Sequence, residues 1–166
     1  MTAKQLTKTE QLRHVFMHHL NRLYFGKDNL NSKMESLIQS ASFPNLQLAL
    51  AEMWDDIKQQ ISKMEGIYQL MGAKPVEESC NPIQSFINDE FCLSQPEAAA
   101  IQNDIDIILY VQLLEHINIT SYRMLKTLAN TFNNQDIKQL LIECFDESVD
   151  DDRLFVMVTD EYLGIK

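Results

Sequence analysis

Hydrophobic residues recur along this chain at intervals of three and four over long stretches, which is the pattern of helices that bury one face. The first stretch begins after Thr7, whose side chain can form a capping box with Glu10, and we expect its helix to end near Ser40. Its predicted buried face consists of Phe16, Leu20, Leu23, Leu30, Met34 and Leu37. Lys27 falls on the same face, so the pattern predicts a lysine within an apolar stripe.

A second amphipathic stretch follows Phe43 and Pro44. Proline is accepted in the first turn of a helix because the N–H groups of that turn have no helical partner. We expect a helix over residues 44–71, ended by Gly72 and Pro75. Its predicted buried residues are Leu46, Leu50, Met53, Ile57, Met64, Ile67 and Met71.

Residues 73–95 connect this helix to the next, and a structureless connection of that length is uncommon in a compact domain. Ile83, Phe86, Ile87 and Phe91 lie at helical spacing, which predicts a short helix inside the connection. Ser94 and Glu97 then repeat the capping-box pattern and predict a third long helix over about 96–131.

The last two long helices each carry polar residues on the face predicted to be buried. For the third helix, that face is Ile101, Ile105, Ile108, Gln112, Glu115, Ile119 and Tyr122. Asn134 is expected to cap a fourth helix over 135–162. Its inward residues are predicted to be Ile137, Leu141, Cys144, Phe155 and Val158, with Ser148 and Asp151 on the same face.

Two short connections flanking one long connection, between the second and third long helices, are typical of a ferritin-like antiparallel four-helix bundle. The chain has 166 residues, of which 45% are hydrophobic, and only four glycines and four prolines. This composition disfavours a fold of many short strands and tight turns. We therefore expect a single all-α domain over residues 1–166, with a short extra helix in the crossover.

The charge of the chain excludes several classes of partner. A formal net charge of −10 disfavours binding to nucleic acid or to anionic membranes. No apolar run approaches the roughly 20 residues of a membrane span, and residues 1–11 lack the apolar core of a secretory signal. The three cysteines form no CxxC pair. We therefore expect a cytoplasmic protein with reduced thiols.

Several segments together resemble a known bacterial family. They are LY at 23–24, IKQQISKMEGIYQLMGAKP at 57–75, QLLEHIN at 112–118, SYRMLKTLA at 121–129 and LLIECFDES at 140–148, with Cys80 and Asp104 between them. In order and spacing they resemble the stress-associated ferritin-like proteins of the YciF type, over residues 12 to about 159. The resemblance implies a four-helix bundle with a short crossover helix and a stress-related role.

Members of this family resemble di-iron carboxylate proteins, in which carboxylates and histidines from all four helices hold two metal ions. The resemblance implies a glutamate where this chain has Lys27, a histidine where it has Met53, and a glutamate where it has Ser148. A protonated lysine offers no lone pair and repels a cation, and a thioether is a soft ligand. We therefore predict a degenerate di-iron site that holds no metal.

Other positions keep ligand chemistry. The resemblance implies that Asp56 replaces a glutamate and that Glu115 and His116 are retained, while a shift of one residue would put Glu147 in place of Ser148. Iron or another divalent metal held by these four residues is the alternative prediction. For Glu115 and Gln112, a hydrogen-bonded polar layer in the core is the simpler interpretation.

Buried carboxylates need a compensating positive charge. We therefore hypothesise that Lys27 forms an ion pair with Glu115 in place of the metal, with Asp56 or Asp151 nearby. The sequence contains no Ser-His-Asp arrangement, phosphate loop or nucleophile elbow, so no catalytic residue is proposed.

Two functional interpretations follow. The sequence favours a non-enzymatic protein that acts as a homo-oligomer, expected to be a dimer, or binds a protein partner. The alternative is a metal-binding ferritin-like oxidoreductase with an altered site, which rests on analogy of fold.

Overall fold

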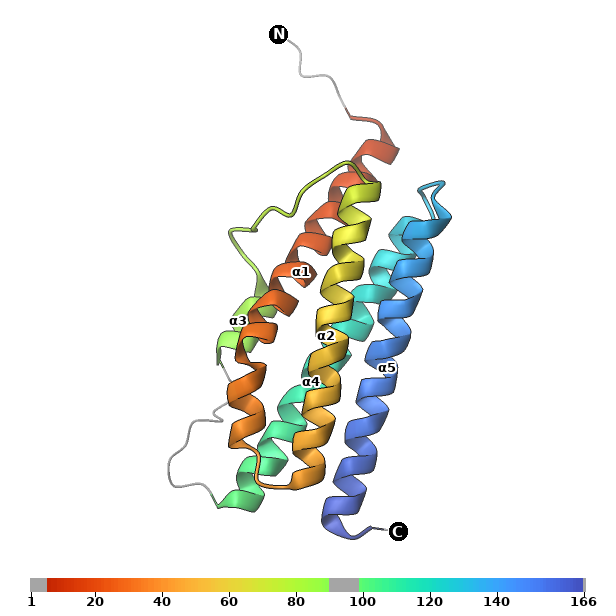
Figure 1. The fold of residues 1–166 in the computed structure, drawn as a ribbon. Coiled ribbons are helices and arrows are strands. Elements are labelled where there is room, and N and C mark those ends of the chain that lie inside the picture. Colours follow the sequence, from red (N-terminus) through yellow and green to blue (C-terminus); the bar gives the residue numbers. More distant parts are fainter. Residues whose placement is uncertain (1–5, 90–98, 166) are drawn as a thin grey trace.

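The computed structural model describes residues 6–89 and 99–165, in which it places four long helices and one short one. Helices α1 (Lys8–Ser40) and α2 (Pro44–Leu70) form one antiparallel hairpin, and α4 (Ala100–Ala129) and α5 (Gln135–Leu163) form a second (Figure 1). The short α3 (Pro82–Asp89) belongs to the connection between the hairpins. Because α2 and α4 run in the same direction, that connection has to return along the bundle (Figure 1). The predicted four-helix bundle with an extra crossover helix is confirmed.

The first hairpin begins and turns where the sequence predicts. The Glu10 N–H donates to Thr7 Oγ1 at 3.3 Å, and the Thr7 N–H donates to Glu10 Oε2 at 2.7 Å, which completes the capping box. Pro44 occupies the first turn of α2. These local interactions fix the start of each helix independently of the rest of the bundle.

Of the two helix starts predicted for the second hairpin, only that of α5 lies within the described residues. The side-chain oxygen of Asn134 accepts hydrogen bonds from the backbone N–H groups two and three residues later, at 3.0 and 3.2 Å, so the predicted cap of α5 is confirmed. The capping box predicted for Ser94 and Glu97 lies outside the described residues. In the described part of the chain, α4 begins at Ala100.

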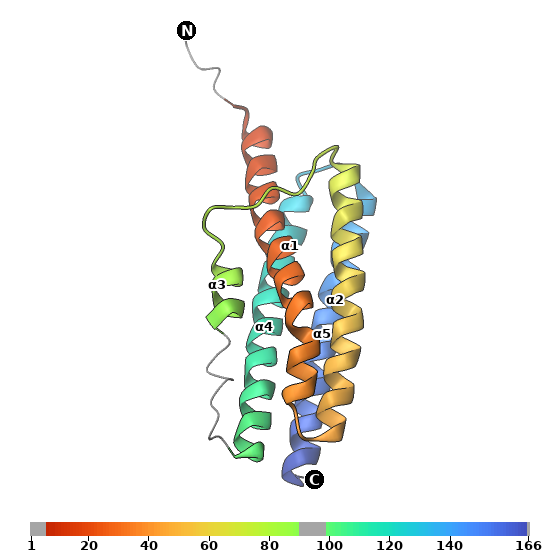
Figure 2. The same ribbon diagram turned by 60° about the vertical axis from the view of Figure 1, so that its left-hand side comes forward.

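The short helix α3 lies outside the bundle, against α1 and α4 (Figure 2). The Asn81 side-chain oxygen accepts from the Ile83 N–H at 3.1 Å, and its amide group donates to the backbone oxygen of Arg22 on α1 at 2.9 Å. A Cβ atom placed on Gly26 of α1 would lie 2.5 Å from Ile83 Cγ2, so the glycine permits the close approach of α3. The Tyr110 hydroxyl on α4 donates to a backbone carbonyl of α3 at 3.2 Å.

A buried carboxylate joins the helices at the end of the bundle where α2 begins. Asp104 on α4 accepts from the Ser42 N–H at 2.7 Å, from the Ser42 hydroxyl at 2.5 Å and from the Tyr162 hydroxyl on α5 at 3.0 Å. The Tyr162 ring also stacks on Phe43, with ring centroids 4.6 Å apart. These contacts hold the α1–α2 turn, α4 and α5 together.

The core is divided into two apolar clusters that follow each other along the bundle. The cluster nearer the α1–α2 turn includes Leu30, Met34, Met53, Ile57, Val111 and Phe155. The other includes Leu20, Leu23, Met64, Tyr122, Leu141 and Cys144. The stripes predicted for the first, second and fourth long helices are buried throughout and are therefore confirmed.

The buried face predicted for the third long helix is partly wrong. Ile101 is 56% exposed, and Ile105, Gln112 and Ile119 are only half-buried. The inward positions of α4 instead include Asp104, Ile107, Val111, Leu114 and Asn118. This helix is apolar on almost every side, as exposed Leu109 and Met124 show, so periodicity alone does not select its inner face.

Two further observations concern the state of the cysteines and whether any helix could cross a membrane. Cys144 is a buried free thiol and Cys80 an exposed one, whereas Cys92 lies outside the described residues. Among the described residues, no helix is both long enough and apolar enough to cross a membrane.

Candidate functional site: a buried polar layer

Polar side chains from all four long helices meet between the two apolar clusters. This polar layer consists of Lys27 on α1, Gln60 on α2, Glu115 and Asn118 on α4, and Ser148 and Asp151 on α5. Each of these residues is at most 3% exposed. They are buried because each lies three or four positions from apolar residues that face the core, so the helical repeat carries the polar residue inward as well.

The charged centre of the polar layer is a pair formed by Lys27 and Glu115. Lys27 Nζ lies 3.9 Å from Glu115 Oε1, and the two side chains are 2% and 0% exposed. The same ammonium lies 5.9 Å from the centroid of the Tyr122 ring. The structure therefore brings together the two residues for which the sequence suggested an ion pair.

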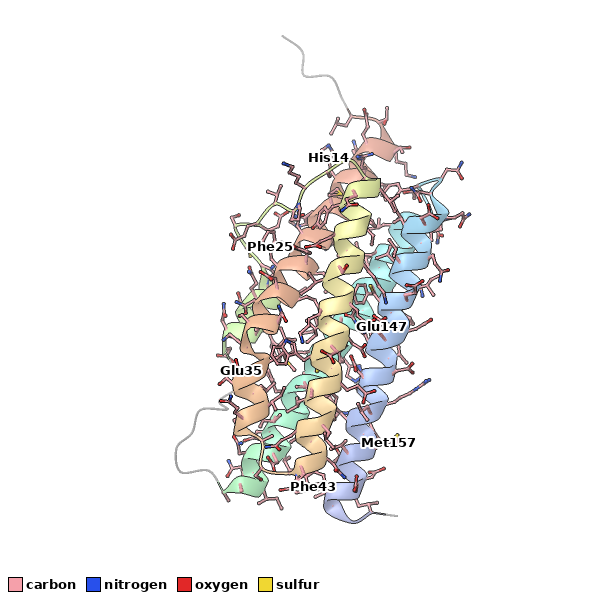
Figure 3. The ribbon with its side chains drawn as sticks, in the orientation of Figure 1. His14, Phe25, Glu35, Phe43, Glu147 and Met157 are labelled. Atoms are coloured by element: carbon pink, nitrogen blue, oxygen red, sulfur yellow. The ribbon has the colours of Figure 1, made fainter. Side chains whose placement is uncertain are left out.

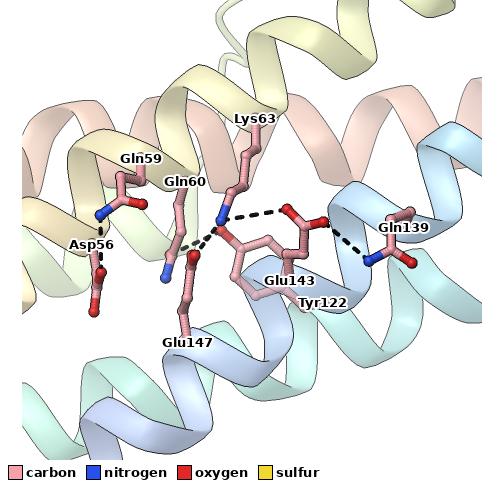
Figure 4. A network of polar contacts seen from close by, with 8 residues as sticks. All are labelled: Asp56, Gln59, Gln60, Lys63, Tyr122, Gln139, Glu143 and Glu147. Carbon is pink, nitrogen blue, oxygen red and sulfur yellow. Dashed lines mark hydrogen bonds and ion pairs between the residues drawn. The ribbon is translucent and has the colours of Figure 1, made fainter.

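Neutral groups complete the contacts around this pair. The Asn118 amide donates to Glu115 Oε1 at 3.0 Å. The Tyr122 hydroxyl donates to Gln60 Oε1 at 3.1 Å, which connects α4 to α2 (Figure 4). Burial is the main cause that raises the pKa of Tyr122 well above its usual value, so the hydroxyl keeps its proton and acts as a donor.

Several polar atoms of the layer have no hydrogen-bond partner in the described part of the protein. They are Lys27 Nζ, Gln60 Nε2, Glu115 Oε2, Ser148 Oγ and Asp151 Oδ2. A buried polar atom left unpaired costs about 1–3 kcal/mol. The polar layer is therefore a weak point for stability in an otherwise apolar core.

Asp151 is the second buried carboxyl group of the layer. Burial is the largest cause that raises its pKa, from an ordinary 3.8 to about 8, and the negative charge of Glu115 raises it further. The positive charge of Lys27 acts in the opposite direction. At neutral pH, Asp151 is therefore mainly protonated, and the Lys27 and Glu115 charges offset each other.

Asp56 and Glu147 lie at the edge of the bundle instead of in the polar layer. Asp56 is half-buried and accepts from the Gln59 amide at 3.3 Å (Figure 4). Burial, followed by the charges of Glu147 and Glu52, raises the pKa of Asp56. Glu147, midway along α5 (Figure 3), forms an ion pair with Lys63 of α2 (Figure 4).

His116 points away from the layer. Its side chain is 66% exposed, and its Nε2 lies 3.6 Å from Asp152 Oδ1 on α5. One residue corresponds to about 100° around a helix, so His116 cannot face inward together with Glu115. Of the four suggested ligands, Asp56, Glu115, His116 and Glu147, the structure places only Glu115 in the core.

These positions allow a test of whether the residues fit a metal centre. A di-iron bundle requires carboxylates and imidazoles that converge from facing helices. Among the described residues, no group of three or more His, Cys, Asp or Glu side chains is placed to hold a metal ion. The two carboxyl groups of the layer share it with a lysine ammonium, which has no lone pair. The residues present do not form the ligand set of a di-iron centre.

Gln60 and Asn118 are the members of the layer that sequence reasoning missed. The predicted stripe of the second helix stepped from Ile57 to Met64, and the position skipped between them is that of Gln60. Asn118 lies three residues after Glu115 and therefore on the same side of α4. In both cases the helical spacing was the available signal.

The architecture and the polar layer together define a ferritin-like helical bundle whose inner polar residues do not form a metal ligand set. The chain matches the family described as "Domain of unknown function (DUF892)" over residues 11–161. The protein belongs to this family. No curated protein matches the chain in sequence.

Two solved structures show the same fold. The E. coli stress protein YciF superposes with a TM-score of 0.86 at 21% sequence identity, covering 93% of this chain and 98% of that chain. YcfI from Rhodopseudomonas palustris gives a TM-score of 0.81 at 19% identity, covering 93% and 97%. The ferritin-like fold and the resemblance to proteins of the YciF type are thereby confirmed.

Proposed function

We propose that this protein is a metal-free, non-enzymatic ferritin-like protein that acts in the cytoplasm as a homo-oligomer or a partner-binding module. The description of YciF as a stress protein supports a stress-related role. The observation that carries the proposal is the Lys27 ammonium, which is buried 3.9 Å from the Glu115 carboxylate in the middle of the bundle.

Charge balance is the physical reason for proposing a metal-free protein. A carboxylate inside a bundle needs a positive charge beside it, and in di-iron bundles the metal ions supply that charge. Here the ammonium of Lys27 supplies it for Glu115, while the raised pKa of Asp151 keeps that second carboxyl group mainly neutral at pH 7. The polar layer is thus close to electrically neutral without a metal ion.

Elemental analysis tests the proposal directly. The native protein, Lys27→Glu and Lys27→Met are purified from iron-supplemented cells, and bound metal is measured per chain. We expect no stoichiometric metal in the native protein or in Lys27→Met, which removes the charge without adding a ligand. We expect uptake by Lys27→Glu, which adds a carboxylate beside Glu115 and Asp151. Stoichiometric iron in the native protein would overturn the proposal.

A metal-binding oxidoreductase with an altered site is the second candidate. Two carboxyl groups in one buried layer, each with an oxygen that has no partner among the described residues, favour it: Glu115 Oε2 and Asp151 Oδ2. In this case native protein would contain metal, and Glu115→Gln would remove it. The fold by itself adds little, because one fold supports many activities.

The oligomeric part of the proposal needs its own measurement. Ferritin-like bundles can pair through apolar helix faces, and exposed Leu48 and Met157 show that α2 and α5 carry apolar side chains on their outer surfaces. Sedimentation velocity over a range of concentrations should give the mass of a dimer. If the protein is a monomer at every concentration, the homo-oligomer is excluded and only the partner-binding module is retained.

A further inference from the structure

A pocket of about 580 Å³ opens on the outside of the bundle, between α1, α3 and the second half of α4. Figure 2 shows how α3 stands beside α1 and α4 at this place. The walls include His19 and Arg22 of α1, Ile83 and Phe86 of α3, and Ile117 and Met124 of α4. Small-molecule sites typically have volumes of about 300–1,000 Å³, mostly apolar walls and a few polar groups.

The α3 wall of the pocket is fixed in place. Asn81 caps α3 and at the same time donates to the backbone oxygen of Arg22, which joins the wall to α1. The absence of a side chain at Gly26 lets Ile83 pack directly on α1. The Tyr110 hydroxyl attaches α3 to α4 at 3.2 Å. The pocket is therefore built by contacts that exist without a ligand.

The charge of the pocket is opposite to that of the whole protein. The formal net charge of the chain is −10, yet no Asp or Glu of the described residues lines the pocket. The Glu78 carboxylate near Arg22, on which the Arg22 charge acts, forms its ion pair with His18, at 3.0 Å. The buried Nε of Arg22 has no hydrogen-bond partner within the described residues. A guanidinium offers two parallel N–H groups to one oxyanion.

The two histidines of the pocket have different roles. Burial, followed by the charges of His18 and Arg22, lowers the pKa of His19, which is therefore neutral at pH 7 and offers hydrogen bonding instead of charge. His116 lies at the rim, where Asp152 is 3.6 Å away. Arg22 is thus the positive group of the pocket that is available to a ligand.

We propose that this pocket binds an amphipathic carboxylate. The carboxylate head would pair with the Arg22 guanidinium, and the apolar body would lie between the α3 side chains Ile83 and Phe86 and the α4 side chain Met124. The head group follows from the Arg22 guanidinium, whose Nε has no hydrogen-bond partner among the described residues, and the apolar body follows from the walls. The site lies on the surface, away from the polar layer, so it is independent of whether that layer holds a metal.

Methionine methyl NMR provides the test. The protein is labelled with [methyl-¹³C]methionine and titrated with decanoate below its micelle concentration. Met124 lines the pocket and is 52% exposed, whereas Met157 lies on another face near the end of α5 (Figure 3) and is 67% exposed. We expect a saturable shift of the Met124 signal and no change at Met157. Decanol, which has the same chain without the charge, should bind about tenfold more weakly.

Two variants separate the head from the body of the ligand. Arg22→Gln should weaken decanoate binding about tenfold and leave decanol binding unchanged. Thr120→Phe adds bulk at an exposed position of the pocket wall and should block both ligands. Because Thr120 is on the surface, this variant is expected to fold even if Arg22→Gln does not.

Four results would overturn the inference. They are the absence of a saturable Met124 shift, an equal response at Met157, equal affinities for decanoate and decanol, and unaltered decanoate binding by folded Thr120→Phe. The first would leave the pocket as an empty surface feature, the second and fourth would place binding elsewhere, and the third would remove the role of Arg22.

Discussion

Lys27 on α1 and Glu115 on α4 place opposite charges 3.9 Å apart in a part of the bundle that solvent does not reach. Burial removes the hydration of both charges, and their mutual attraction offsets that loss only when geometry and additional hydrogen bonds are favourable. Here the ammonium has no hydrogen-bond partner among the described residues. The pair therefore adds little net stability, although each charge depends strongly on the other.

A double-mutant cycle measures this dependence. Lys27→Met and Glu115→Leu should each lower the free energy of unfolding by about 3–5 kcal/mol, because each leaves one buried charge unpaired. The double variant should be close to the native protein or more stable. Urea unfolding gives the free energy of unfolding of the native protein, the two single variants and the double variant. Losses that simply add in the double variant would contradict the buried-pair interpretation.

The pair of Lys63 and Glu147 is a suitable control for the cycle. It also joins two helices, α2 and α5, but its side chains are 18% and 22% exposed. Water reaches this pair in part, so removing either partner should cost less than removing Lys27 or Glu115 from the fully buried pair.

The stability of the protein should depend on pH through Asp151. Folding raises the pKa of this carboxyl group from 3.8 to about 8, so between these values the folded state holds a proton that the unfolded chain has released. Stability due to this group therefore falls as pH rises, by up to about 1.4 kcal/mol per pH unit. The Asp151→Asn variant has no ionisable group at this position. Its free energy of unfolding, measured relative to that of the native protein, should therefore increase as the pH is raised from 5 to 8.

The matched control for that measurement is Asp150→Asn. Asp150 is 75% exposed and lies one residue away on the same turn of α5. Its difference from the native protein should stay constant over the same pH range. If the Asp151→Asn difference were also constant, Asp151 would not be protonated in the folded state at neutral pH.

Replacing two glycines by alanine should change the stability of the protein in opposite directions. At Gly26, an added Cβ would lie 2.5 Å from Ile83 Cγ2 and 3.1 Å from Ile83 Cβ, so α3 would have to move, at a cost of about 1–3 kcal/mol. At Gly66, the closest atom would be Leu140 Cδ1 at an ordinary 3.5 Å. Gly66→Ala should therefore stabilise α2 by about 0.5–1 kcal/mol through helix propensity. Thermal unfolding measures both, and equal effects would show that α3 is not closely packed on α1.

Removing the hydroxyl of Tyr162 should lower the free energy of unfolding more than removing that of Tyr24. Tyr162→Phe removes a hydrogen bond to the buried Asp104 carboxylate and should cost about 1.5 kcal/mol, while keeping the ring stacked on Phe43. The Tyr24 hydroxyl donates to Glu65 at an exposed site, so Tyr24→Phe should cost less than about 0.5 kcal/mol. Urea unfolding compares the two, and a larger effect at Tyr24 would argue against the role of Asp104.

Much of the bundle was predictable from the sequence because α1, α2 and α5 each have one apolar face. On α1, Lys27 is the polar residue within the apolar stripe from Phe16 to Leu37, so it had to be buried if the helix was to bury that stripe. The helix starts at Thr7 and Asn134 were predictable for another reason, since capping depends on residues within one turn.

The inner face of α4 could not be read in this way. This helix carries isoleucines and leucines on nearly all sides, so its orientation is decided by packing against α1, α3 and α5. Sequence reasoning therefore took Gln112 and Ile119 as inward and did not recognise Asn118. It also grouped His116 with Glu115, although adjacent residues of a helix point in different directions.

The division of the core into two apolar clusters with a charged layer between them has a consequence for how the helices align. Leucine, isoleucine and methionine side chains can interdigitate at more than one offset, so apolar packing alone allows a helix to slide along its neighbours. A slip of α1 by one turn, about 5.4 Å, would move the Lys27 ammonium among apolar side chains and leave Glu115 without its counter-charge. The polar layer thus fixes the axial register of the four helices.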